Sequence, residues 1–312
     1  MHAVLARRLG DPDVLEIVDL PVPDPGPGQV RVRVVAATVN PIDLSARSGR
    51  LTSSGLLPRT TDVPLGWDVA GHVDAVGPGV TRFRPGDPVV GLRDVLVAGG
   101  THADAVVLDQ HAVAPAPRSV DLVTAATLPL NALTADRALD QTGARPGDSL
   151  LVTGAAGGVG GFVLQLAAVR GIETVALVRP HQVDAARDLG AAHVVTDGDA
   201  LWRDVRGPVP GGVDAVVDAA VVGAAAHAAL RAGGTFVALV RPFAPPPVRA
   251  TTVVVQEVFA DGARLTELAA LVDFGLLDLR VAEVVPFADA ARAHALVEAG
   301  GLAGRVVLVP AA

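Results

Sequence analysis

The sequence predicts a two-domain protein of the α/β class, in which an all-β module precedes a doubly wound parallel sheet. The first observation is a glycine-rich turn that joins an apolar strand to a helix within residues 149–169. The second is a series of β-branched strands and Gly/Pro turns over residues 1–118, and the third is an alternation of apolar strands and helices from about Asp121. Half of the 312 residues are hydrophobic, which is enough for two cores.

Composition excludes several partners. The net charge is −8 and the basic residues are scattered, so we expect no nucleic-acid partner. No apolar stretch is long enough to span a bilayer, and residues 1–10 lack the apolar run of a signal peptide. We therefore expect a soluble, cytoplasmic protein with no membrane partner.

Three residue types are missing from the chain: Cys, Tyr and Lys, since all 25 basic residues are Arg. The chemistry therefore excludes disulfides, thiolate metal sites, Schiff-base lysines and Tyr–Lys proton donors. Any acid or base must be Asp, Glu, His, a hydroxyl relay or water.

The first module is predicted from strands at 30–39, 69–76 and 88–90, which Gly/Pro turns separate. The tail from about Asp278 returns to β character, with strands at 281–285 and 305–309 around a helix at 289–299. We expect this tail to fold back on the first module.

The glycine-rich turn has the spacing G-x-x-G-x-x-G, with one further glycine. Glycines let the backbone approach a diphosphate closely, and the N–H groups and dipole of the following helix stabilise the anion. A turn that merely packs a helix on a sheet is the alternative. The cofactor-binding residues predicted here are Gly154, Ala155, Ala156, Gly157, Gly158, Val159 and Gly160.

A second strand, residues 174–178, follows after a helix-length crossover and completes a βαβ unit. An NAD site wants a carboxylate at its end, but this strand closes on Arg179, with His181 beside it. A guanidinium can pair bidentately with a 2′-phosphate, which favours NADPH over NADH. The alternatives are a solvated surface arginine and an ordinary helix-start histidine. Asp218, at the end of the strand predicted at 215–218, is also assigned to the cofactor site.

A further β run, residues 253–255, follows three consecutive prolines. Two interpretations stay open, an edge strand that pairs across a dimer and an internal strand of the sheet.

The chain resembles the medium-chain dehydrogenase/reductase superfamily, and within it the zinc-independent quinone oxidoreductase branch. The resemblance implies a GroES-like β domain at 1–118, completed by 278–312, and a Rossmann NADPH domain at 119–277. It also implies an active site in the cleft between them and a homodimer. The segments that carry the resemblance are V-N-P-I-D (39–43), G-W-D-V-A-G-H-V-D-A-V-G-P-G-V (66–80), L-P-L-N-A-L-T-A (128–135), R-P-G-D-S-L-L-V-T-G-A-A-G-G-V-G (145–160) and G-R-V-V-L-V (304–309).

Zinc-dependent members of this superfamily place ligands at positions that here look like Asn40, Trp67 and Leu130, and none of these is a usual zinc ligand. The structural zinc lobe of those relatives needs four cysteines. We therefore expect no metal. What remains is hydride transfer to a carbon made electrophilic by a conjugated carbonyl, which needs placement of that carbon and a donor to the developing oxyanion.

Asn40 is the first candidate for that donor, with Asp43 orienting its loop. The alternatives are turn chemistry for Asn40 and a helix cap for Asp43. His102 is a candidate proton donor, against a purely structural histidine. Asp136 is a charge without explanation that could reach the cleft.

Further residues follow from the resemblance. Thr127, Asn131 and Thr134 match a segment that passes the nicotinamide, and an ordinary helix surface is their alternative. Trp67, Asn131 and Phe243 are assigned to substrate, with a core tryptophan as the alternative for Trp67.

The predicted function is an NADPH-dependent, zinc-independent reductase of a small quinone or an α,β-unsaturated carbonyl compound. Two alternatives stay open: a tailoring enzyme of the same fold that catalyses a non-redox cyclisation or isomerisation, and a non-catalytic NADPH-binding protein.

Overall fold

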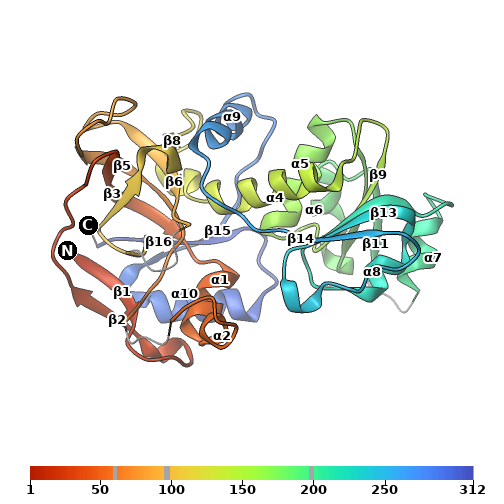
Figure 1. Cartoon of the computed structure of the whole chain (residues 1–312), viewed down its shortest axis with the longest axis horizontal. Helices are drawn as coiled ribbons and strands as arrows, with labels where there is room; N and C mark the ends of the chain where they lie inside the picture. Colours follow the sequence, from red (N-terminus) through yellow and green to blue (C-terminus); the bar gives the residue numbers. More distant parts are fainter. Residues whose placement is uncertain (59–61, 95–98, 197–199, 312) are drawn as a thin grey trace. The chain divides into compact units, whose positions relative to one another are not determined.

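The computed structural model describes residues 1–58, 62–94, 99–196 and 200–311, which form two compact units (Figure 1). Unit 1 comprises Met1–Leu130, Phe259–Gly275 and Leu279–Ala312, and unit 2 comprises Asn131–Val258 and Leu276–Asp278. This division by contacts places residues 119–130 and 259–275 with unit 1. The boundaries predicted from the sequence, 118/119 and 277/278, remain predictions for the functional domains.

Unit 1 is built on two β-sheets. One has the strand order β2-β1-β4, and the other has the order β15-β16-β3-β5-β6-β8, with β7 paired to β3. The strands are β1 (His2–Ala6), β2 (Leu15–Asp19), β3 (Gln29–Thr38), β4 (Val63–Pro64), β5 (Asp68–Val76), β6 (Pro88–Leu92), β7 (Ala105–Asp109), β8 (Val113–Pro115), β15 (Val281–Pro286) and β16 (Arg305–Val309).

The helices of unit 1 are short apart from two. They are η1 (Pro12–Val14), α1 (Pro41–Arg47), α2 (Arg50–Ser53), η2 (Gln110–Ala112), α3 (Leu122–Ala125), α9 (Gly262–Asp273), η5 (Phe287–Asp289) and α10 (Ala290–Ala299). β16 pairs antiparallel with β3, so the tail does fold onto the first module, and both contribute to one core that includes Val32, Val69 and Leu308. Burying such alternating aliphatic side chains is what stabilises this sheet.

Unit 2 is a six-stranded parallel sheet with the order β11-β10-β9-β12-β13-β14. This is the Rossmann order, in which the chain reverses direction across the sheet between β9 and β12. The fold class predicted from the sequence is therefore confirmed. The strands are β9 (Ser149–Thr153), β10 (Glu173–Val178), β11 (His193–Thr196), β12 (Val213–Asp218), β13 (Leu230–Ala238) and β14 (Thr252–Val255).

The connections of unit 2 are helical, as parallel strands require. They include α4 (Pro129–Thr142, which begins in unit 1), α5 (Gly158–Val169), η3 (Pro180–Gln182), α6 (Val183–Asp188), α7 (Leu201–Arg206), α8 (Ala224–Ala228) and η4 (Arg241–Phe243). Strand β9 is buried at all five residues, which is typical of a central parallel strand covered on both faces. Within the described part of the chain, none of the helices combines the length and the apolarity that crossing a membrane needs.

Candidate functional site

The glycine-rich turn lies at the carboxyl end of β9 and leads directly into α5. Gly154 has a φ of +58°, a left-handed conformation that side chains other than glycine rarely adopt. A Cβ atom at Gly160 would lie 2.3 Å from the carbonyl oxygen of Gly154 and 2.8 Å from Cα of Ala155. The helix therefore packs on the turn so closely that only glycine fits at position 160.

Backbone hydrogen bonds fix the shape of this turn. The Gly157 N–H donates to the Gly154 carbonyl at 2.9 Å, and the Ala155 N–H donates to the Leu177 carbonyl of β10 at 3.3 Å. Gly157 is the N-cap of α5, so the N–H groups of the first helical turn have no acceptor within the helix. Together with the positive end of the dipole of a 12-residue helix, they make a site suited to an anion.

The carboxyl end of β10 carries exposed polar residues next to this turn in the sheet order. Arg179 follows the strand, and its backbone N–H donates to the Gln182 side chain at 3.2 Å. The side chains of Arg179 and His181 are both exposed. No carboxylate stands at the end of β10, so the electrostatics there favour a phosphate over a ribose hydroxyl.

Asp218 ends β12 and is almost completely buried. One carboxylate oxygen accepts from the Thr153 hydroxyl at 2.5 Å and from the Val222 N–H at 3.0 Å, and the other accepts from the Gly223 N–H at 2.8 Å. Both oxygens are thus used by unit 2 itself. The predicted contact between Asp218 and the cofactor remains a prediction.

Other residues predicted to contact the cofactor lie on or before α4. Asn131 and Thr134 are three residues apart on this helix, so they share a face, and both are buried. Thr127 is buried in unit 1, where its hydroxyl donates to the Thr124 carbonyl at 2.8 Å. The charge of Asp136, which the sequence left unexplained, has a partner in the structure: Asp136 forms an ion pair with Arg170 at the end of α5.

In unit 1, Asn40 and Asp43 belong to a buried polar network at the start of α1. The Asn40 amide nitrogen lies 3.0 Å from the Thr38 hydroxyl and 3.2 Å from Asp68 Oδ2. Asn40 Oδ1 accepts from the guanidinium of Arg305 in β16. Asn40 is 1% exposed, so donation to a substrate requires one of these internal bonds to be replaced.

Asp43 joins two segments of unit 1. Its Oδ2 accepts from the Asn40 N–H at 2.8 Å, which caps α1, and its Oδ1 accepts from the Gly66 N–H at 2.7 Å. Burial raises the pKa of Asp43, and the nearby His102 and the two N–H groups oppose that rise. These contacts agree with the helix-cap interpretation; a role in catalysis remains a prediction.

Asp68, to which the sequence assigned no role, is the second buried carboxylate of this network. Its Oδ1 accepts from the Thr38 N–H at 3.0 Å and from the Thr38 hydroxyl at 2.6 Å. Burial raises the pKa of Asp68, while the Thr38 hydroxyl and the positive charge of Arg305 oppose that rise. The network therefore holds β3, α1, β5 and β16 together at one point.

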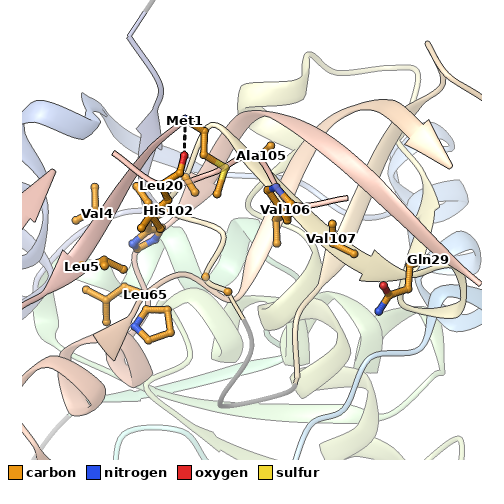
Figure 2. Close-up of a pocket in the computed structure, with 16 residues that line it drawn as sticks. Met1, Val4, Leu5, Leu20, Gln29, Leu65, His102, Ala105, Val106 and Val107 are labelled. Atoms are coloured by element: carbon orange, nitrogen blue, oxygen red, sulfur yellow. Dashed lines mark hydrogen bonds between the residues drawn. The ribbon is translucent and has the colours of Figure 1, made fainter. Parts of the chain in front are cut away.

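His102 is buried, and its Nε2 lies 3.0 Å from the Thr38 carbonyl oxygen. Because a carbonyl only accepts, Nε2 carries a hydrogen. Among the described residues, Nδ1 has no hydrogen-bond partner. Figure 2 shows the ring of His102 among aliphatic side chains that line a cavity of about 250 Å³ in unit 1, which include Val4, Leu20 and Leu65.

The two predicted aromatic contacts to substrate differ in exposure. Trp67 is 5% exposed, and the guanidinium of Arg93 lies 4.7 Å from the centre of its ring. Burial lowers the pKa of Arg93 to about 10, so it stays positively charged at neutral pH. Phe243, in η4 of unit 2, is 55% exposed. Contact of either ring with a substrate remains a prediction.

Among the described residues, no group of three or more His, Cys, Asp or Glu side chains is arranged to hold a metal ion. The resemblance predicted that Asn40, Trp67 and Leu130 stand where zinc-dependent relatives place zinc ligands, and this correspondence remains a prediction. Asn40 is occupied by its own network, and the other two side chains offer no zinc ligand of the usual kind.

Comparison with known proteins agrees with this arrangement. Residues 26–118 match the family described as the alcohol dehydrogenase GroES-like domain, and residues 189–308 match the family described as zinc-binding dehydrogenase. The chain is 31% identical to the 2-methylene-furan-3-one reductase of Solanum lycopersicum, over 96% of this chain and 77% of that protein. It is 32% identical to the chloroplastic NADPH-dependent alkenal/one oxidoreductase of Arabidopsis thaliana, over 99% of this chain and 80% of that protein.

Solved structures give the same result. An NAD-dependent alcohol dehydrogenase superposes with a TM-score of 0.89 at 32% identity, over 99% of both chains. The quinone oxidoreductase of Coxiella burnetii has a TM-score of 0.87 at 26% identity, also over 99% of both chains. Mycobacterial Rv1454c complexed with NADPH has a TM-score of 0.86 at 32% identity, over 99% of this chain and all of that one.

The fold, the glycine-rich turn and these relatives define the class of protein: the chain belongs to the medium-chain dehydrogenase/reductase superfamily. Within that superfamily it belongs to the quinone oxidoreductase branch, as the sequence motifs predicted.

Proposed function

We propose that this protein is an NADPH-dependent reductase that delivers hydride to an α,β-unsaturated carbonyl compound or a quinone. The observation that carries the proposal is the arrangement at the carboxyl ends of strands β9 and β10 in unit 2. There a glycine-rich turn enters α5, and the neighbouring strand β10 is followed by an exposed arginine and by no carboxylate. Relatives named as alkenal/one and furanone reductases support the substrate class.

The residues present fit this cofactor. A Cβ atom at Gly157 would lie 3.0 Å from the Gly154 carbonyl oxygen, and one at Gly160 would lie closer still. The turn is therefore too tight for side chains at these two positions, and backbone groups are what it offers to a ligand there. The amides at the start of α5 would hold the diphosphate, and Arg179 would hold the 2′-phosphate. One structural relative is named as NAD-dependent, but the charge beside this turn favours the phosphorylated cofactor.

NADPH supplies the hydride when it is bound. The chain's part is to place the acceptor, exclude water and stabilise negative charge on the acceptor's oxygen. Asn40 is the proposed hydrogen-bond donor to that oxygen, with Asp43 fixing its backbone and Asp68 its amide. His102 is proposed to supply the proton that completes the reduction, since histidine is the side chain whose ordinary pKa lies nearest to neutral pH. The reaction is proposed to need no zinc.

We also propose that the protein is a homodimer in which β14 pairs with its counterpart. Among the described strands, β14 is the last of the unit 2 sheet. The N–H of Gln256 donates to Ala238 of β13 at 2.9 Å. Because bonding alternates along a strand, the N–H groups of Val253 and Val255 point to the open edge. An unpaired edge of three β-branched residues favours addition of another strand.

The dimer is tested by light scattering on the wild-type protein and on Val253→Pro. We expect twice the chain mass of 31.5 kDa for the wild type and the mass of one chain for the variant. The substitution removes an N–H that points away from β13, so β13 pairing should survive. A wild-type protein with the mass of one chain would contradict the proposal.

The proposed activity is tested by NADPH oxidation against matched pairs of acceptors. Each enone or quinone is compared with its saturated ketone, in the presence of a chelator and with NADH as the second cofactor. We expect turnover only with the conjugated acceptors, a preference for NADPH, and no effect of the chelator. Tight NADPH binding without turnover on any acceptor would contradict the reductase and favour a non-redox role.

A further inference from the structure

The segment that follows β12 is anchored by two side chains at the ends of neighbouring strands. Asp218 accepts hydrogen bonds from the Val222 and Gly223 N–H groups, as described above. The hydroxyl of Thr153 at the end of β9 donates to Asp218 and accepts from the Ala220 N–H at 2.9 Å. Three amides of this short segment are therefore fixed by one carboxylate and one hydroxyl.

The anchored segment has a conformation that its sequence does not favour. Val221 has a φ of +61°, in the left-handed region, where a β-branched residue is a genuine outlier. Such a conformation persists only where surrounding contacts determine it. Here the amides on both sides of Val221 are held, that of Ala220 by Thr153 and that of Val222 by Asp218.

The same segment packs against the glycine-rich turn. A Cβ atom at Gly154 would lie 3.0 Å from Cβ of Ala220. At its other end, a Cβ atom at Gly223 would lie 3.3 Å from the carbonyl oxygen of Phe243. Residues 219–223 are thus placed between the turn that is proposed to hold the diphosphate and the residue proposed to contact substrate. A shift of this segment would leave the first turn residue, Gly154, without its neighbour.

We propose that Asp218 and Thr153 are positioning residues that preorganise the cofactor site by holding the strained segment 219–223 against the glycine-rich turn. This inference rests on the proposed function. It differs from direct binding, because both oxygens of Asp218 are already used by the Thr153 hydroxyl and by backbone amides. Preorganised amides bind an anion more tightly because less ordering remains to be done on binding.

The chain contains a matched control on the same two strands. At their amino ends, Asp214 of β12 accepts from the Ser149 N–H at 2.8 Å, from the Ser149 hydroxyl at 2.7 Å and from Arg231 Nε at 2.6 Å. Like Asp218 and Thr153, this pair joins a carboxylate of β12 to a hydroxyl of β9, and Asp214 has Arg231 as a further partner. It lies at the opposite end of β9 from the glycine-rich turn, so it can stabilise the sheet without shaping the cofactor site.

The test compares Asp218→Asn with Asp214→Asn. An amide at 218 presents N–H groups where two backbone N–H groups and a hydroxyl need acceptors, so the segment should loosen. We expect the Kd for NADPH to rise about tenfold in Asp218→Asn, the effect of about one lost hydrogen bond, with kcat at saturating NADPH changed much less. Asp214→Asn should lower Tm but leave Kd near the wild-type value.

Two further measurements keep the test decisive. If Asp218→Asn does not fold, Thr153→Val replaces it in the test, with Ser149→Ala as the control. Thr153→Val should also raise the Kd for NADPH. Hydrogen exchange on the unliganded protein should show faster exchange at the Ala220, Val222 and Gly223 amides in Asp218→Asn, whether or not the protein binds NADPH. A wild-type protein that does not bind NADPH overturns the proposed function, whereas unchanged exchange overturns the anchoring. An unchanged Kd in Asp218→Asn, or an equal rise in Asp214→Asn, overturns the positioning role.

Discussion

The polar groups that we propose to bind NADPH in unit 2 and those that we propose to act on the substrate in unit 1 differ in their surroundings. In unit 2, the backbone amides of the glycine-rich turn and the exposed side chain of Arg179 gather at one edge of the sheet. In unit 1, Asn40, Asp43 and Asp68 are buried, and Asn40 donates hydrogen bonds to both carboxylates. We therefore expect substitutions in the NADPH site of unit 2 to weaken cofactor binding more than they lower stability. Substitutions in the polar network of unit 1 should lower stability as well as activity.

The largest effect is expected from Gly160→Ala in unit 2. The added Cβ would meet the Gly154 carbonyl and Cα of Ala155 well inside contact distance, so α5 and the turn must separate. We expect NADPH affinity to fall on the order of 100-fold, measured by titration calorimetry. The control is Gly211→Ala, because a Cβ there meets nothing within 4 Å. Equal affinities for both variants would show that the turn does not hold the cofactor.

A smaller effect on binding, with a clear effect on stability, is expected from Asn40→Ala in unit 1. The substitution removes the amide donor to Asp68 Oδ2 and one of the two oxygens that accept from the guanidinium of Arg305, which should lower the free energy of unfolding by about 2 kcal/mol. Turnover should fall while the Kd for NADPH is unchanged. Ser48→Ala, at the exposed end of α1, is the control. Full turnover in Asn40→Ala would remove Asn40 from the mechanism and leave it only in the fold.

The comparison predicts a pH effect on stability that belongs to unit 1. Burial lowers the pKa of His294 to about 2, and the neighbouring His102 and Arg47 act in the same direction. The unfolded chain binds this proton near pH 6.5 and the folded chain does not, so stability falls as the pH drops below that value. Between pH 7 and pH 5 this one group should cost about 2 kcal/mol.

His294→Leu isolates that contribution. The variant should lose about 2 kcal/mol less than the wild type between pH 7 and pH 5 in urea unfolding. Asp43 and Asp68 act in the opposite direction, because burial raises their pKa values, but they are present in both proteins. Identical pH slopes for the two proteins would show that His294 is protonated in the folded state.

Much of the fold was predictable because its signals are local. The alternation of β3 and the apolar run of β9 are read within one strand, and the glycine spacing at 154–160 is read within one turn. The polar network of unit 1 was not predictable as a network. Asp68 pairs with Thr38 across 30 positions, and Arg305 pairs with Asn40 across 265.

The surroundings of several buried residues could not be predicted from the sequence. The sequence offered no explanation for the charge of Asp136, because its partner Arg170 lies 34 positions away in the chain. His294 was part of a correctly predicted helix, yet nothing in its sequence neighbours shows that its ring lies 6.2 Å from that of His102. The hydrogen bonds from the Val222 and Gly223 N–H groups to Asp218 were not predictable either, because they depend on the conformation of the segment that follows the strand.

The central claim is that the edge of the unit 2 sheet binds NADPH through the glycine-rich turn and Arg179. It is tested most directly by the dissociation constants of NADPH and NADH for the wild type and Arg179→Ala. Loss of a charge-assisted, bidentate contact should raise the NADPH constant about 10- to 100-fold and leave the NADH constant nearly unchanged. Equal changes for both cofactors, or none for either, would contradict the claim and make Arg179 an ordinary surface residue.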